Sequence, residues 1–99
     1  MEKLRTLAAR KYYLLSTHRY YFFTGHKVYE ESLILTVTNN GGSICFTFVD
    51  LSSNEEIAYE NPTSGDYIIP LKKGSKMKLV ITSSNARGAY KIAKRTVKE

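Results

Sequence analysis

The chain has 99 residues, a formal net charge of +6 and 42% hydrophobic residues, with one cysteine, eight tyrosines and no tryptophan. This length and composition predict one globular domain rather than a disordered chain, and a single cysteine excludes an internal disulfide. No segment approaches the run of about 20 apolar residues that crosses a membrane as a helix, so no membrane span is expected.

The basic N-terminus is not followed by an uninterrupted apolar stretch, because Arg10 and Lys11 break it. A signal peptide needs such a stretch, so none is predicted. The cytoplasm is therefore the default location, and export is expected only if the chain is part of a longer exported protein.

The first thirty residues contain conflicting signals. Residues 1–10 contain good helix formers and could be a short helix, a strand or a tail. The aromatic residues that follow favour strands, and the polar segment 16–18 could turn the chain between two of them. We therefore expect a hairpin over residues 11–24.

From residue 32 onward, apolar and polar residues alternate with the period of a strand. Leu33, Leu35 and Val37 share one face of the first such strand. The Asn-Asn-Gly-Gly segment at 39–42 then predicts a tight hairpin turn into a second strand over residues 43–49.

Four further short strands, separated by polar turns, are expected over residues 57–59, 67–71, 76–82 and 89–93. Pro70 lacks a backbone donor, so its strand should lie at a sheet edge. Residues 83–88 are polar and end in Gly88, which predicts a turn between the last two strands. Residues 94–99 are charged and should fray.

Turns at intervals of about 8–12 residues are typical of sandwiches and small barrels. The sequence therefore predicts an all-β, antiparallel β-sandwich of about seven short strands, with an N-terminal segment of uncertain structure. A parallel sheet would need crossover helices, and none is visible after residue 30. The expected core consists of Leu33, Leu35, Val37, Ile44, Phe46, Phe48, Tyr67, Ile69, Met77, Leu79, Ile81, Tyr90 and Ile92.

Three segments have the form of a turn that leads into a strand: residues 64–71, Lys73-Gly74 before the strand at 77–81, and residues 85–92. In a known group of small β-sandwich modules, a Gly ends such a turn and an aromatic residue packs at the start of the next strand. On these segments, residues 32–93 resemble small bacterial β-sandwich accessory modules of the pre-peptidase C-terminal domain type. The resemblance implies a bacterial, non-catalytic accessory role, such as adhesion or carriage of a partner domain.

The residues that carry chemistry are scattered along the chain. His18 and His26 are eight residues apart and distant from Cys45, so they do not form a metal-binding motif. Cys45 alternates with inward residues and should be a small, buried or half-buried side chain rather than a nucleophile. The paired glutamates at 30–31 and 55–56 are expected to be solvated. No enzyme activity, metal or cofactor is therefore predicted.

The charges are strongly segregated along the sequence. Residues 1–30 carry six Lys or Arg against two Glu, residues 31–71 carry six acidic and no basic residues, and residues 72–99 carry nine Lys or Arg against one Glu. Opposed blocks could pair inside the domain, bring two copies together or present a basic face to an anionic partner.

Basic and aromatic residues also form a candidate binding surface. Its members are Tyr12, Tyr13, Tyr20, Tyr21, Lys72, Lys73, Lys76, Lys78, Lys91 and Arg95. The favoured interpretation is a non-catalytic interaction or structural module that binds a protein partner or itself. The alternative is single-stranded nucleic-acid or other polyanion binding, since basic grooves with aromatic platforms hold such ligands. A solvated lysine face that keeps a sheet edge from aggregating would look the same.

Overall fold

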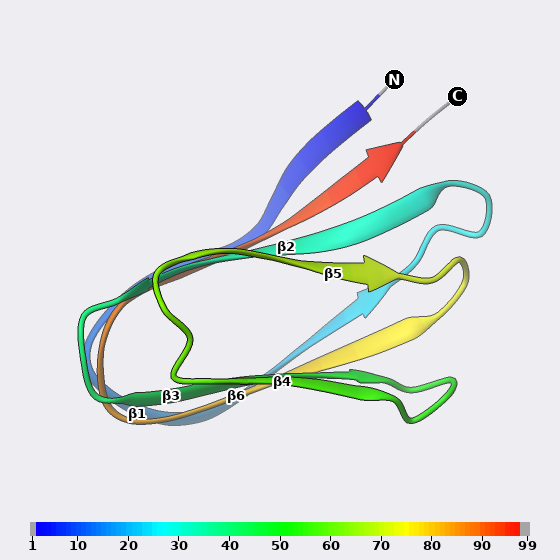
Figure 1. The fold of residues 1–99 in the computed structure, drawn as a ribbon. Helices are drawn as coiled ribbons and strands as arrows, with labels where there is room; N and C mark the ends of the chain where they lie inside the picture. The colour runs from blue at the N-terminus through cyan, green and yellow to red at the C-terminus, as the bar shows by residue number, and fades with distance from the viewer. Residues whose placement is uncertain (1, 98–99) are drawn as a thin grey trace.

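The computed structural model describes residues 2–97, and its regular secondary structure is entirely β-strand (Figure 1). The six strands are β1 (Glu2–Thr24), β2 (Glu30–Asn39), β3 (Ser43–Asp50), β4 (Glu56–Glu60), β5 (Gly65–Leu71) and β6 (Lys76–Val97). Every paired neighbour is antiparallel. The predicted all-β antiparallel class is confirmed. The strands number six rather than about seven because two of them are long.

Strand β6 is the centre of the sheet. Along one side it pairs with β1, from Thr24 opposite Lys76 to Glu2 opposite Val97. Along its other side, residues 77–84 pair with β3 and residues 88–97 pair with β2. Strands β4 and β5 extend the sheet from β3 and β2.

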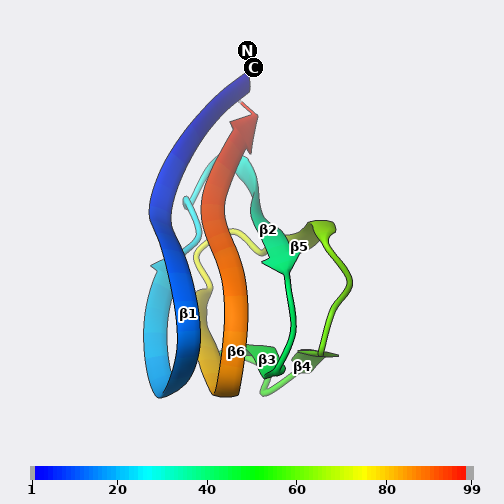
Figure 2. The ribbon, with the colours of Figure 1, turned by 90° about the vertical axis from the view of Figure 1, so that its left-hand side faces the viewer.

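The sheet is therefore folded over into two facing layers, as Figures 1 and 2 show. The upper layer of Figure 1 contains the first half of β1, the second half of β6, β2 and β5. The lower layer contains the second half of β1, the first half of β6, β3 and β4. The result is a β-sandwich whose layers are joined through two bent strands.

The bend falls where turns are predicted from the sequence, but the chain does not reverse there. The β1–β6 register shifts between Tyr12 and Leu15 and again before Thr17, and Leu14 and Asn85 both have φ of 53°. Bulges of this kind bend a paired strand and increase its twist. The predicted hairpin over residues 11–24 and the predicted turn over residues 83–88 are both wrong, because polar and Gly residues there bend a continuous ribbon.

The ends of the ribbon also differ from expectation. Residues 2–10 are strand rather than helix or tail, and residues 94–97 are paired with β1 and β2 rather than frayed. Residues 98–99 lie outside the described residues. The turn at 39–42 leads from β2 in the upper layer to β3 in the lower layer, and these strands do not pair within residues 2–97. The predicted hairpin there is therefore a connection between layers.

The core lies between the layers and follows the predicted alternation. Of the thirteen expected core residues, all but Tyr67 are buried, and Tyr67 is half-buried against the cluster. Phe23, Leu71 and Ala86 join them from β1, β5 and β6. Pro70 lies on β5, which pairs with β2 alone and so forms the edge of the upper layer, as predicted. Among residues 2–97 there is no helix long and apolar enough to span a membrane.

Gly88 allows β6 to lie close to β2 beside the bend. Its φ is 144°, and a Cβ built on it would collide with the carbonyl oxygen of Thr38 on β2 and approach the Tyr12 hydroxyl. We expect Gly88→Ala to lower the free energy of unfolding by about 2–5 kcal/mol, from backbone strain and overpacking together. Urea denaturation monitored by circular dichroism measures this loss.

Gly41→Ala is the matched control for this variant. Gly41 also has a positive φ, of 127°, but nothing lies within 4 Å of the place that a Cβ would occupy there. The control should lose only the backbone strain, about 1–2 kcal/mol. Equal losses in the two variants would contradict the close packing at the bend.

Candidate functional site

The structure does not bring the ten predicted binding residues into one surface. Tyr12 is buried and Tyr21 is half-buried against the core. Lys72 and Lys73 lie between β5 and β6, where Lys72 pairs with Glu55 at 3.1 Å and Lys73 pairs with Glu30 at 3.7 Å. The other members divide between the outer faces of the two layers.

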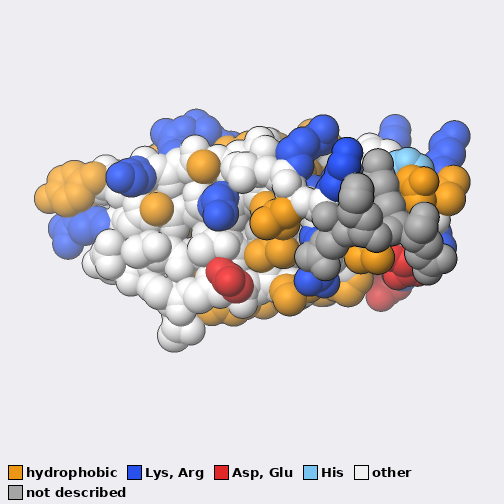
Figure 3. Space-filling model, turned by 90° about the horizontal axis from the view of Figure 1, so that it is seen from above, with side chains coloured by type: hydrophobic (Ala, Val, Ile, Leu, Met, Phe, Trp, Pro, Cys, Tyr) orange, Lys and Arg blue, Asp and Glu red, His pale blue; other side chains and the backbone are white. Residues whose placement is uncertain are grey.

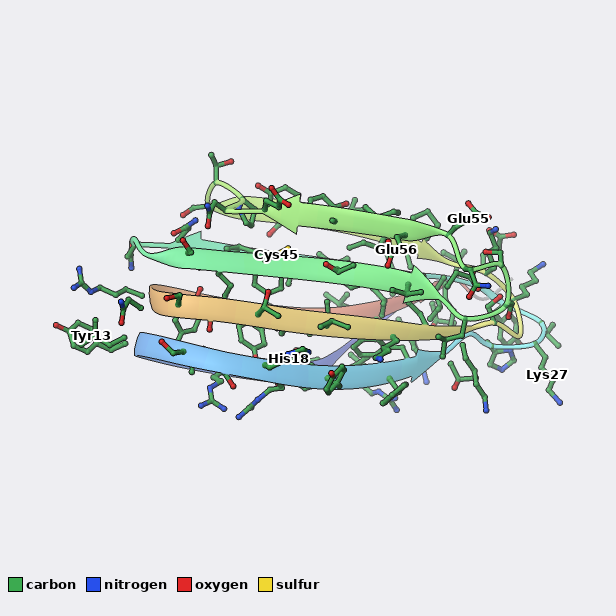
Figure 4. The ribbon with its side chains drawn as sticks, turned by 90° about the horizontal axis from the view of Figure 1, so that it is seen from below. Tyr13, His18, Lys27, Cys45, Glu55 and Glu56 are labelled. Carbon is green, nitrogen blue, oxygen red and sulfur yellow. The ribbon has the colours of Figure 1, made fainter. Side chains whose placement is uncertain are left out.

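On the lower layer, Tyr20, Lys76 and Lys78 point outward from β1 and β6, and the Lys78 ammonium lies 4.5 Å from the centre of the Tyr20 ring. On the upper layer, Lys91 and Arg95 point outward from β6, on the opposite side from the buried Tyr90 and Ile92. Tyr13 lies at the bend, at the end of the molecule opposite Lys27 (Figure 4).

Tyr12 and Tyr21, the inward tyrosines of β1, have different polar environments. The Tyr12 hydroxyl is buried and makes no hydrogen bond with any described residue, and burial raises its pKa. The Tyr21 hydroxyl lies 2.8 Å from that of Tyr90. Burial alone would raise the pKa of Tyr21, but hydrogen bonds with Tyr90 and Arg19 lower it, together with the positive charges of Arg19 and Arg10. Burial raises the pKa of Tyr90.

An ionic cluster that the sequence analysis missed lies at the open end of the sandwich. The Glu31 side chain is 4% exposed and accepts hydrogen bonds from the Thr96 hydroxyl at 2.6 Å and the His26 amide at 2.6 Å. The Lys94 ammonium lies 3.6 Å from Glu31 and donates to the carbonyl of Thr24 at 2.9 Å. Glu31 is two residues before Leu33 on the same strand, so the alternation that predicts an inward Leu33 also predicts an inward Glu31 side chain.

Lys3 and Arg5 line the same end, in a cavity of about 350 Å³ that also contacts the Glu31 cluster. Because Lys94 of the upper layer bonds to Thr24 of the lower one, the cluster links the two layers where the core ends. These contacts give the cluster a structural role, which is to hold the two layers together at this end.

The outer face of the lower layer is largely uncharged along its centre. Tyr20, Val80, Thr47 and Ala58 stand opposite one another across β1, β6, β3 and β4. The neighbouring row runs from Phe22 through Lys78 and Val49 to Glu56. Phe22 is 67% exposed and Tyr20 is 48% exposed. We call the uncharged residues of these rows the aromatic face; its residues are Tyr20, Phe22, Thr47, Val49, Ala58 and Val80.

Opposite charges lie on two different strands of this layer, and Lys78 stands within the Phe22 row, between Phe22 and Val49. Lys76 and Lys78 point outward from β6, whereas Glu56 and Glu60 point outward from β4 at the far edge. Figure 4 shows this face, with His18 on β1 and Cys45 on β3. Cys45 is half-buried, as predicted, and its sulfur lies 3.6 Å from the Thr47 hydroxyl. The segregation of charge along the sequence is thus also a segregation across this layer.

The outer face of the upper layer contains a second group, which we call the basic groove. Lys11, Ala89 and Thr38 stand opposite one another across β1, β6 and β2. Arg87 and Lys91 precede and follow Ala89 on the same face of β6, and the Arg87 guanidinium lies 5.4 Å from the centre of the Tyr13 ring. Figure 3 shows Lys and Arg side chains spread along this face.

Lys11 and Arg87 were absent from the predicted surface. They meet only because β1 and β6 pair through the bend, and no local pattern reveals that register. Within residues 2–97, no group of three or more His, Cys, Asp and Glu is placed to hold a metal ion.

Comparison with known proteins gives no basis for assigning a family or a function. No family model and no curated protein matches the chain. Among solved structures, the P-domain of Macrobrachium rosenbergii nodavirus is similar, with 16% identity, a TM-score of 0.38 and coverage of 97% of this chain and 92% of that chain. A likeness this low carries no argument about function.

The unpartnered Tyr12 hydroxyl generates a stability prediction. A buried polar group without a hydrogen bond costs about 1–3 kcal/mol, so Tyr12→Phe should raise the free energy of unfolding by about 1 kcal/mol. Tyr21→Phe should lower it by about 1 kcal/mol, because it leaves the buried Tyr90 hydroxyl without its 2.8 Å partner. Urea denaturation of both variants tests the opposite signs, and a loss in both would contradict the assignment.

The Glu31 cluster generates a pH prediction. Burial would raise the pKa of Glu31, but hydrogen bonds from Thr96 and His26 and the charge of Lys94 hold it below its ordinary value of 4.5. A carboxylate with a lowered folded-state pKa stabilises the fold above its ordinary pKa, and this stabilisation is lost as the pH falls through the lowered value. The free energy of unfolding should therefore fall below about pH 4.5.

Glu31→Gln should flatten that acid dependence and cost about 1–3 kcal/mol at neutral pH, because a buried charge-assisted contact is lost. Glu55→Gln is the control, since the pKa of Glu55 is also lowered, first by its hydrogen bond with Lys72, but both side chains are exposed. Exposed pairs contribute little, so the control should keep most of the acid dependence. Thermal denaturation between pH 3 and 7 compares the two.

Proposed function

We propose that the chain is a non-catalytic interaction module that associates with a second copy of itself through the aromatic face. The observation that carries this proposal is the uncharged row of Tyr20, Val80, Thr47 and Ala58, next to the exposed ring of Phe22 on the same strand as Tyr20. Contiguous exposed apolar surface with polar margins is typical of interaction sites. The resemblance of residues 32–93 to accessory modules implies a non-catalytic role as well.

The two rings supply the driving force for association. Burying an aromatic side chain is worth about 1.5–3 kcal/mol relative to leaving it exposed. Phe22 and Tyr20 are neighbours on β1 and point to the same side, so one partner surface covers both. Aromatic residues are enriched at the centres of protein interfaces for this reason.

Charge complementarity favours a second copy as the partner. A two-fold axis parallel to the strands sets the β1–β6 half of one copy against the β3–β4 half of the other. With β1 set over the partner's β4 and β6 over the partner's β3, Lys78 lies over the partner's Val49 and one strand away from the partner's Glu56. Phe22 lies over β4 next to the partner's Ala58. The same patch serves both copies, and the opposite charges of β6 and β4 fix the orientation.

The size of the face predicts weak association. Four strands about 4.8 Å apart and five residues about 3.3 Å apart cover an area of roughly 15 by 17 Å. This is roughly 250 Å² per copy, well below the area that a stable specific interface buries, so only a weak, transient complex is expected. The dimer should therefore be populated at high protein concentration and dissociate on dilution.

Sedimentation velocity over a range of protein concentrations tests the proposal. The native chain should sediment increasingly as a dimer, and Phe22→Asp should remain monomeric because it places a charge in the apolar contact. Ile68→Asp is the control, since Ile68 is 56% exposed on the upper layer, away from the aromatic face. A native chain that stays monomeric at every concentration and salt condition contradicts the proposal.

A charge exchange tests the orientation separately. Lys78→Glu alone should weaken the dimer, because Glu56 of the partner then lies one strand away from a like charge. Combining Lys78→Glu with Glu56→Lys should restore it. A double variant as weak as Lys78→Glu alone would exclude the proposed two-fold arrangement.

A further inference from the structure

The basic groove presents three cations that no described carboxylate neutralises. Lys11, Arg87 and Lys91 surround Ala89, one on the neighbouring strand and two on the same face of β6. The ion pairs formed by described residues involve other lysines. Lys91 stands opposite Thr36 of β2, and Thr36 stands opposite Asp66 of β5. Asp66 accepts a hydrogen bond from the Thr36 hydroxyl at 2.8 Å. The groove is therefore an electropositive surface.

Its floor is made by small residues. Two adjacent hollows of about 360 and 570 Å³ share Lys11, Thr38 and Ala89 as lining residues, and Gly88 lines the larger one. Glycine and alanine leave space between the cationic side chains that larger residues would fill. Thr36, Thr38 and Asn40 line the β2 side and add polar groups that can donate hydrogen bonds.

An exposed aromatic ring closes the bend end of the groove. Tyr13 is 75% exposed and is held beside the Arg87 guanidinium. The strand on which it lies is bulged at this point, with Leu14 at φ of 53°, so the ring projects from the end of the molecule. A ring in this position is accessible to a planar ligand group and adjoins the cations at the same time.

We propose that the basic groove binds single-stranded nucleic acid without sequence preference, with phosphates against Lys11, Arg87 and Lys91 and one base stacked on Tyr13. Cations that follow a backbone, combined with an aromatic platform, are the features that hold single strands. A duplex keeps its bases stacked inside and cannot offer one to Tyr13. The groove and the aromatic face lie on opposite layers, so this proposal is independent of self-association.

Fluorescence anisotropy with a labelled single-stranded oligothymidine of about 15 nucleotides tests the proposal at low salt. Affinity should fall with salt with a slope of about −2 in log–log form, as expected for three phosphates neutralised on a single strand. Tyr13→Ala should weaken binding by about tenfold through lost stacking. The combined Lys11→Ala, Arg87→Ala and Lys91→Ala variant should abolish the salt-dependent binding.

The control removes the same charge from the opposite end of the molecule. A combined Lys27→Ala, Lys72→Ala and Lys73→Ala variant should keep at least most of the affinity, since these exposed side chains lie away from the groove. Circular dichroism verifies that each variant is folded.

Four outcomes would overturn the proposal. They are no binding at low salt, equal losses in the groove and control variants, binding that Tyr13→Ala leaves unchanged, and a preference for a duplex of the same length. Binding of a heparin fragment without binding of the oligonucleotide would assign the groove to sulfated glycans instead.

Discussion

The pairing of β1 with β6 is the interaction on which the rest of the structure depends. Every other strand pairs with β6 or with a neighbour of β6, so the ribbon fixes the position of all of them. Its bend sets the two layers face to face and encloses the apolar residues of β2, β3 and β6 between them. Bulges near Leu15 and positive φ angles at Leu14 and Asn85 accommodate this bend without breaking the ladder.

The sequence predicted what depends on local alternation and missed what depends on strand partners. The core was predictable because Leu33, Phe46 and Leu79 each lie within a period-two pattern, and a strand with that period buries one face. Turn chemistry marked 16–18 and 83–88, which lie near the bend, although the irregular backbone of β1 there is at residues 12–17 and no reversal occurs at either place. Whether the chain reverses or bends there is decided by pairing across about seventy residues, which no local pattern encodes.

The candidate sites show the same division. Adjacent tyrosines in a strand point in opposite directions, which separates Tyr12 from Tyr13, but only the structure shows that Tyr12 is the buried one. The segregation of charge along the chain was visible in the sequence, but the strands on which the basic and acidic residues lie, and their order in the sheet, were not. The two basic segments form the β1–β6 ribbon and the acidic segment forms the flanking strands, so each layer has basic residues on the ribbon and acidic residues away from it.

The position of β1 in the sheet has a consequence for folding. Described residues of β1 pair only with β6, so the first strand of the sheet to be synthesised has no partner until the last strand is complete. Contacts of such high sequence separation, like that between Tyr21 and Tyr90, make folding slow because a long loop must close first. During that interval an aromatic strand is unpaired, and unpaired strands with exposed apolar side chains are prone to aggregate.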